Sequence, residues 1–228
     1  MSNSISQTDA RRLYQQVADQ IRSLIQEKGI EIGGRLPPER DLAQQLGVSR
    51  PSLREALIAL EIEGTVEIRM GSGIYYLGES SQPTRQYGDS PSELMEARIA
   101  IETATASMAA ARADAAGITR LREILRQMEL ELDAGRALLE LDRRFHIEIA
   151  VQSGNPVLAR LVGEIFESRF NPLSIQLREH FDNDQSWRAA FVEHGLILEA
   201  IVTKDALRAS SQMAAHLLAS GRRWEREA

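Results

Sequence analysis

The chain has only four histidines, and three of them could meet in a metal site. Asp142 and His146 are four residues apart, so both side chains can lie on one face of a helix. His194 and His216 lie in two later helical segments, and antiparallel packing of these segments would bring the imidazoles together. One carboxylate and three imidazoles suit a divalent ion such as Zn²⁺, Ni²⁺ or Mn²⁺, with positions left for water or a ligand carboxylate. Spacing alone also allows plain hydrogen-bonded or surface histidines.

A second group of reactive residues is a cluster of arginines between residues 35 and 54. Arg50 and Arg54 are four residues apart near the start of a predicted helix, so they project from one face. Arginine can bind guanine through two hydrogen bonds, and serine hydroxyls and N-terminal amides suit phosphate. The cluster therefore indicates DNA recognition. The alternative is a solvated helix face with Arg–Glu pairs, for example Arg54 with Glu55 or Glu61.

The elements predicted around these arginines are helices followed by a hairpin. Apolar residues at helical spacing predict helices from Leu13 to Gly29, from Pro38 to Gly47 and from Ser49 to Gly64. Two short strands around a Gly-rich turn at residues 70–73 follow. The last two helices are joined by a short turn, Gly47-Val48. This order is typical of a winged helix-turn-helix, whose second helix enters the major groove.

The second half of the sequence predicts helices only, and an all-α bundle is the simplest arrangement for them. The predicted helices cover residues 92–113, 118–134, 137–153, 156–180, 185–203 and 204–225. A segment rich in Ser, Pro, Gly and Gln precedes them and is typical of a linker. We therefore expect a mainly α protein, with a winged helix-turn-helix domain at 1–78, a linker at 79–91 and an all-α domain at 92–228.

Composition excludes several classes of protein. The absence of cysteine removes disulfides, thiolate zinc fingers and cysteine nucleophiles. A net charge of −6 argues against nonspecific coating of nucleic acid, although a local patch could still read DNA. A transmembrane helix needs a run of about 18 apolar residues, and the sequence has none. The N-terminus also lacks an apolar signal core, so we expect a soluble cytoplasmic protein.

Residues 11–78 resemble the GntR family of bacterial transcription regulators. The resemblance rests on the string Pro37-Pro38-Glu39-Arg40-Asp41-Leu42-Ala43, followed by Leu46-Gly47-Val48-Ser49-Arg50 and Leu53-Arg54-Glu55-Ala56-Leu57. It implies that a set of matching residues contacts DNA, with the glycine of the wing entering the minor groove. These residues are Arg35, Arg40, Ser49, Arg50, Ser52, Arg54 and, in the wing, Gly71.

The C-terminal half resembles the FadR-type (FCD) ligand-binding domain of the same family. Its metal motif is Asp-x-x-x-His with two later histidines, and the chain fills it with Asp142, His146, His194 and His216. The resemblance therefore implies a bound divalent metal, with zinc first and nickel or manganese as alternatives. The pair Arg98-x-x-x-Glu102 also matches, which implies that an acidic effector faces it. The alternative for this pair is a plain salt bridge within one helix.

The stretch from Asn171 to His180, with Trp187 and Phe191, resembles the subgroup that regulates hexuronate and related sugar-acid catabolism. Arg169 and His180 could then contact the hydroxyls or carboxylate of an effector. Both are equally compatible with ordinary surface positions.

Taken together, these features predict a regulator rather than an enzyme. We expect a homodimeric repressor of sugar-acid catabolism that binds a palindromic operator, because two recognition helices must match two half-sites. An organic acid such as a hexuronate or aldarate would bind at the metal and weaken operator binding. Two alternatives stay open: a metal-dependent hydrolase fused to a DNA-binding domain, and a regulator that senses the metal itself.

Overall fold

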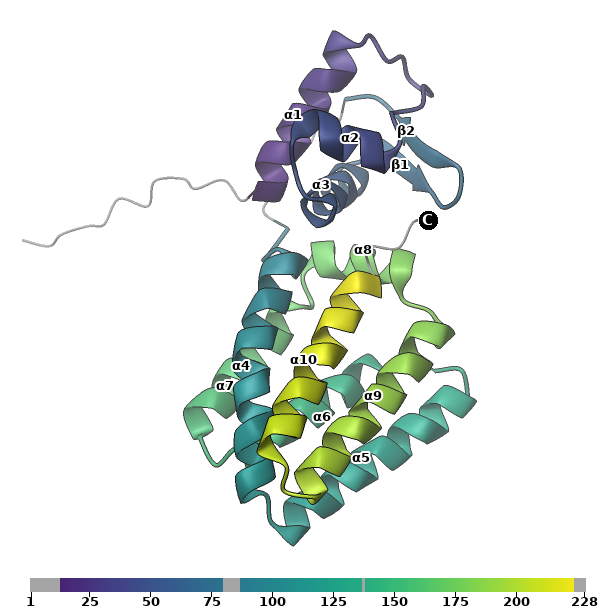
Figure 1. The fold of residues 1–228 in the computed structure, drawn as a ribbon. Helices are drawn as coiled ribbons and strands as arrows, with labels where there is room; N and C mark the ends of the chain where they lie inside the picture. The colour runs from purple at the N-terminus through teal and green to yellow at the C-terminus, as the bar shows by residue number, and fades with distance from the viewer. Residues whose placement is uncertain (1–12, 80–86, 137, 224–228) are drawn as a thin grey trace, which may run out of the picture. The chain divides into compact units, whose positions relative to one another are not determined.

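A computed structural model of the chain describes residues 13–79, 87–136 and 138–223. These residues form two compact units that divide between Ser90 and Pro91 (Figure 1). Within the described ranges, the first unit has three helices and a two-stranded antiparallel sheet, and the second has seven helices. The protein is therefore mainly α, as the sequence predicts.

Parts of the predicted domains and linker lie outside the described residues, namely 1–12, 80–86, 137 and 224–228. The end of the predicted linker is described and is bound to the N-terminal unit. The backbone N–H of Tyr87 donates to the hydroxyl of Tyr14 at 3.1 Å. Ser90 donates to Glu55 at 2.7 Å. These bonds fix the chain just before the second unit begins.

The N-terminal unit is built on the contact between its first and third helices. Its elements are α1 Leu13–Glu27, α2 Glu39–Leu46, α3 Arg50–Ile62, β1 Val66–Arg69 and β2 Gly73–Tyr76. Leu13 at the start of α1 is exposed, but the later apolar residues of the helix are buried, as are those of α3 that face it. The buried residues include Val17, Ile21, Leu24 and Ile25 of α1 and Leu53, Leu57 and Leu60 of α3. Burial of these two faces against each other holds the unit together, because each buried leucine contributes about 1.5–3 kcal/mol.

The turn between α2 and α3 has the chemistry that the sequence predicts. Gly47 ends α2 in the left-handed conformation, with φ of 67°. Ser49 then caps α3 by accepting a hydrogen bond from the Ser52 N–H at 3.2 Å. The left-handed conformation costs other residues about 1–2 kcal/mol, so glycine is favoured at this position. The turn sets the direction in which α3 leaves α2.

Replacement of Gly47 by alanine is expected to destabilise the N-terminal unit by about 1–2 kcal/mol, because alanine must adopt a positive φ there. Native-state hydrogen exchange of the amides in α2 and α3 measures this change. Gln44→Ala is the control, since Gln44 is an exposed position within α2 and alanine is a good helix former. Equal exchange protection in both variants would show that the turn carries no such constraint.

The wing is the hairpin formed by β1 and β2. Arg69 pairs with Gly73 at its tip, and residues 70–72 make the turn. Gly71 lies in this turn with φ of 71° and is exposed. Arg35 forms an isolated bridge with Tyr75, which adds a short third segment beside β2. The predicted hairpin and its turn are confirmed.

The C-terminal unit is a helical bundle around one large apolar cluster. Its helices are α4 Pro91–Arg112, α5 Ala115–Asp133, α6 Leu139–Gln152, α7 Pro156–Ser168, α8 Pro172–Phe181, α9 Asp184–Val202 and α10 Ala206–Arg223. The last helix lies between α4 and α9 (Figure 1). Helix α6 packs against α4, α5 and α7. This arrangement directs one face each of α4, α6, α9 and α10 into the interior.

The single helix predicted over residues 156–180 is wrong, because the structure has two helices there. Helix α7 ends at Ser168, and α8 begins at Pro172. Asn171 caps α8 by accepting a hydrogen bond from the Ser174 N–H at 2.7 Å. Proline has no N–H and its ring clashes within a helix, so Asn171-Pro172 starts a new helix as Asn155-Pro156 does. Continuous apolar spacing concealed this break.

Candidate nucleic-acid interface and metal centre

The predicted DNA-binding residues of the N-terminal unit lie along α2, the turn, α3 and the wing. Arg40 has a side chain that is 79% exposed, with a 3.4 Å contact to Asp41. Ser49 is exposed, and Arg50 and Ser52 are half-buried at the start of α3. The Ser49 hydroxyl lies 2.7 Å from that of Ser52, so the cap and its neighbour share a hydrogen bond. These side chains and the start of α3 offer both cations and hydrogen-bond donors.

Two further predicted DNA contacts lie at the wing: Arg35 forms a bridge with Tyr75 of β2, and Gly71 lies in the turn of the hairpin. A Cβ atom added to Gly73 would lie 2.5 Å from Nε of Arg35, so the guanidinium of Arg35 rests against the wing backbone. Arg35 is nevertheless exposed. A Cβ atom added to Gly71 would meet no other atom within 4 Å, so the positive φ of Gly71, and not lack of space, favours glycine at the tip of the wing.

Arg54 differs from the other predicted DNA contacts because it is buried. It is 3% exposed and forms an ion pair with Glu39 in the first turn of α2. The sequence suggested Glu55 or Glu61 as partners of Arg54. Glu61 accepts a hydrogen bond from the Ile68 N–H at 2.9 Å. In this structure Arg54 therefore fixes α3 to α2, and contact with a base requires an exchange of Glu39 for DNA.

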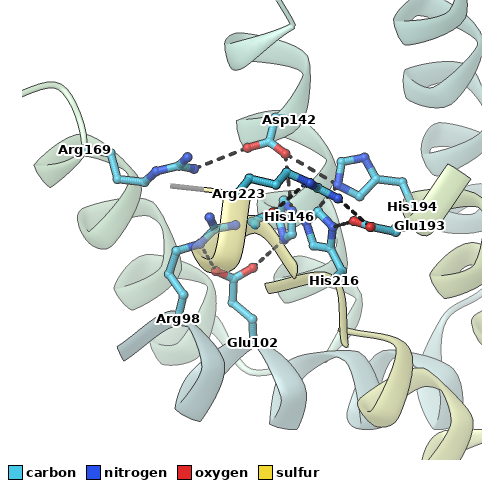
Figure 2. Close-up of polar contacts among 10 residues, drawn as sticks. Arg98, Glu102, Asp142, His146, Arg169, Glu193, His194, His216 and Arg223 are labelled. Carbon is cyan, nitrogen blue, oxygen red and sulfur yellow. Dashed lines mark hydrogen bonds and ion pairs between the residues drawn. The ribbon is translucent and has the colours of Figure 1, made fainter. Parts of the chain in front are cut away.

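The four predicted metal ligands come together inside the C-terminal unit (Figure 2). Asp142 and His146 come from α6, His194 from α9 and His216 from α10. Asp142 Oδ1 lies 3.5 Å from Nε2 of His146 and 3.5 Å from Nε2 of His194. Nε2 of His194 lies 3.2 Å from Nε2 of His216. One ligand atom from each residue falls within 4.8 Å of all the others, and all four residues are buried.

Two further carboxylates hold the imidazole rings in place. Glu102 on α4 lies 2.5 Å from Nδ1 of His146, a close ion-pair contact that lacks the geometry of a hydrogen bond. Glu193 on α9 lies 2.7 Å from Nδ1 of His216. Such partners fix the tautomer and orientation of metal-binding histidines, because they leave Nε2 as the free lone pair. Both Nε2 atoms accordingly point toward the cluster.

Burial and neighbouring charges give three of the four residues, His194, His216 and Asp142, the protonation state that binds a metal. Burial and then His216 and His146 lower the pKa of His194 well below its usual value. Burial and His146 do the same for the pKa of His216. Burial opposes ionisation of Asp142, but His146 and Arg169 outweigh it and hold the carboxyl pKa well below its usual value. Two neutral imidazoles and a carboxylate therefore face one point.

His146 and its partner Glu102 favour their charged forms, a protonated imidazole beside an ionised carboxylate. Burial lowers the pKa of His146, but Glu102 outweighs it, so the net pKa is raised. Burial disfavours ionised Glu102, yet Arg98 and His146 lower its pKa to about 2. Metal binding would displace a proton from His146, since a ligand imidazole must be neutral.

A cavity of about 30 Å³ adjoins the cluster and is lined by three arginines, Arg98, Arg169 and Arg223. That volume holds about one water molecule. Arg98 is 2% exposed, and in the described part of the chain its Nη2 atom has no hydrogen-bond partner. Arg169 donates to Oδ2 of Asp142 at 3.3 Å. Burial and Arg98 lower the Arg169 pKa to about 10, so it stays cationic at neutral pH.

Of the four predicted effector residues, two line the cavity and two do not. Arg98 and Arg169 line the cavity beside Asp142. Glu102 instead lies behind His146 and forms the salt bridge to Arg98 at 2.6 Å that the sequence offered as the alternative. His180 lies on α8 in ring contact with Phe181, and it is not among the described residues that line the cavity.

Two residues of the site were missed from the sequence, Glu193 and Arg223. Arg223 follows His216 by seven residues, or two helical turns, so a search along one helix face could have found it. Glu193 precedes His194 directly and would point elsewhere on an isolated helix. Its bond to His216 depends on how α9 packs against α10, which no spacing rule supplies.

The fold and site define a class of protein: a winged helix-turn-helix regulator with a helical second domain. Residues 13–75 match the model described as "Bacterial regulatory proteins, gntR family". Residues 93–219 match that of the FCD domain. The chain therefore belongs to the GntR family of DNA-binding transcription regulators and carries an FCD domain.

Individual proteins agree with this assignment. The chain is 38% identical over 222 residues to the "Uxu operon transcriptional regulator" of Escherichia coli K12, covering 93% of this chain and 86% of the relative. It is 37% identical to the "Exu regulon transcriptional regulator" of the same strain, covering 92% and 83%. The solved structure of E. coli McbR/YncC shares the fold, with a TM-score of 0.54, 20% identity and coverage of 94% and 97%.

These similarities decide between a transcription regulator and a metal-dependent hydrolase, two of the functions that the sequence left open. The family and the relatives are transcription regulators and not enzymes, so the hydrolase alternative is not supported. In the ranges that the structure covers, no helix has the length and apolar character needed to cross a membrane.

Proposed function

We propose that the chain is a metal-dependent repressor of sugar-acid catabolism, released from its operator by a sugar acid bound at the metal. The observation that supports this most is the shared position of two features. The buried ligand set of Asp142 and the three histidines adjoins the same cavity as Arg98 and Arg169. A metal ion and two guanidinium groups beside one cavity suit a carboxylate.

The donor set fits a divalent metal. Asp142, His146, His194 and His216 would hold it, with the carboxylates of Glu102 and Glu193 as outer partners of two rings. Zinc is favoured by three imidazoles and one carboxylate, and nickel or manganese are alternatives. When bound, the ion would supply an open coordination position for the carboxylate of an organic acid. The chain's own arginines would orient that acid.

The proposed effector is a hexuronate or a related sugar acid such as an aldarate. The names of the relatives, regulators of the Uxu operon and the Exu regulon, support this choice. Ser186 and Ser220 line the cavity together with Trp187. Hydroxyl groups suit the hydroxyls of a sugar, and an aromatic ring suits its C–H face. The cavity holds only about one water molecule, so the acid must enlarge it.

Operator recognition is proposed for the N-terminal unit of a homodimer on a palindromic site. The predicted contacts are Arg35, Arg40, Ser49, Arg50, Ser52, Arg54 and Gly71. The exposure of Arg35, Arg40 and Ser49 supports their roles. Arg54 would act only after it leaves Glu39.

The proposal is tested by operator release. Full-length protein selects its operator from a library of random duplexes, and fluorescence anisotropy then measures affinity with Zn²⁺ and each of D-glucuronate, D-galacturonate, galactarate, D-gluconate and L-lactate. One acid should weaken operator binding by about 5- to 150-fold, the usual range of allosteric effects. Chelation of the metal should abolish the response. A response to Zn²⁺ alone would indicate a metal sensor, and no response to any acid would refute the proposal.

A further inference from the structure

The metal cluster is served by two relays of the same composition, each consisting of an arginine, a glutamate and a histidine (Figure 2). In the first, Arg98 binds Glu102, which contacts His146. In the second, Arg223 binds Glu193 at 2.5 Å, and Glu193 binds His216. The arginine at the far end of each relay also lines the cavity. Each relay therefore joins the cavity to a metal ligand.

The two relays differ in how well they are protected from solvent. The side chains of Arg98 and Glu102 are 2% and 1% exposed. Those of Arg223 and Glu193 are 15% and 25% exposed. Breaking the Arg98–Glu102 pair would leave two unpaired charges in the interior, which costs several kcal/mol. When Arg223 and Glu193 separate, water can bind both groups instead. The second relay is therefore the one that can open.

The position of Arg223 also favours movement. It is the last residue of α10, and its Nη1 atom donates to Ser220 at 3.2 Å within the same turn. A cavity of about 30 Å³ cannot hold a sugar acid until part of its wall moves. Arg98 and Arg169 are buried, so Arg223 is the arginine of the wall with the most freedom.

We propose that Arg223 is the gate of the effector site: it leaves Glu193 when a sugar acid enters and then binds the carboxylate or hydroxyls of that acid. This inference rests on the proposed function. The relay also links the gate to the metal, since Glu193 holds His216. While Arg223 pairs with Glu193, it offsets the negative charge that Glu193 presents to His216; when the acid takes Arg223 as its partner, that charge favours the metal ion. Metal and acid should therefore favour each other's binding.

The test uses the full-length Arg223→Gln variant, which removes the charge and keeps much of the length. Competition with a chromophoric chelator measures Zn²⁺ affinity, and calorimetry measures D-glucuronate binding to the zinc-loaded protein, or binding of whichever acid the wild type prefers. Loss of a charge-assisted bond should weaken acid binding by about tenfold or more. Removal of a nearby positive charge should tighten Zn²⁺ binding by about tenfold.

Opposite changes in the two affinities distinguish a gate from a purely structural residue, whose loss would weaken both. Arg222→Gln is the matched control, because Arg222 is exposed in the same turn and donates only weakly to the Leu218 carbonyl, at 3.4 Å. It should match the wild type in both measurements. Glu193→Gln should act in the other direction on the metal and weaken Zn²⁺ binding by about 10- to 100-fold.

Two results would overturn the gate: acid affinity in Arg223→Gln equal to that of the wild type, or weaker Zn²⁺ binding in that variant. Either result leaves the proposed function intact when the wild type still binds an acid at its metal. If the wild type binds none of the five acids, the proposed function fails and the gate fails with it.

Discussion

Replacing Asp142 with asparagine should reduce the affinity for Zn²⁺ by at least about a hundredfold, because loss of a direct ligand exceeds the 10- to 100-fold cost of losing an outer partner. Asparagine keeps the size of the side chain but removes the anionic charge among three imidazoles. Metal-induced thermal stabilisation should disappear with the affinity, since a ligand that binds only the folded state stabilises it. Chelator competition and thermal unfolding with and without Zn²⁺ measure both effects.

The control for this substitution is Asp133→Asn. Asp133 ends α5, its side chain is 72% exposed, and its contact with Arg188 is long at 3.8 Å. Circular dichroism should show that both variants keep the helical fold. Undiminished Zn²⁺ affinity in Asp142→Asn would mean that the cluster of buried histidines is not the metal site.

Replacing Arg98 with methionine should destabilise the C-terminal unit by about 3–5 kcal/mol, the usual cost of breaking one side of a buried ion pair. Arg98 and Glu102 are both almost fully buried, and Arg98 is the main cause of the low pKa of Glu102 that opposes burial. Without it, His146 is the remaining charged partner of Glu102 among the described residues. Urea unfolding followed by tryptophan fluorescence measures the change in the free energy of unfolding.

Two further variants test the cause of this loss. The double variant Arg98→Met with Glu102→Gln removes both charges and should regain part of the stability. Arg120→Met breaks the salt bridge with Glu148, in which Arg120 is 52% exposed, and should cost at most about 1 kcal/mol. If Arg98→Met costs no more than Arg120→Met, the buried pair does not stabilise the bundle.

The N-terminal unit could be predicted well because its signals are local. Gly47 ends one helix and Ser49 caps the next, and both effects depend on residues within one turn of the chain. The α7–α8 break was also local, at Asn171-Pro172, and was missed only because apolar spacing continued across it. The pairing of Arg54 with Glu39 was not predictable in this way, since it depends on how α2 packs on α3.

The metal centre shows the same division. Asp142 and His146 share a helix, so their spacing alone places them together. His194 and His216 could be added only on the assumption that their helices pack antiparallel, and the resemblance pointed to the same two residues. The second carboxylate of the site, Glu193, depends on the pairing of α9 and α10 and on a side-chain rotamer. His180, which the resemblance suggested as an effector contact, is not among the described residues that line the cavity, although Asp182, two residues further along the chain, is.

Helix α4 begins at Pro91, the first residue after the DNA-binding unit, and runs without a break to Arg112. Arg98 lies seven residues from its start, which is about 10 Å along the axis. After Pro91 the helix contains neither proline nor glycine, the usual causes of a kink. We therefore expect α4 to move as a rigid helix, so that a rotation at Arg98 would also turn Pro91 at its start. If the proposed effector moves Arg98, we expect the motion to pass along this one helix to Pro91, where the chain leaves the N-terminal unit.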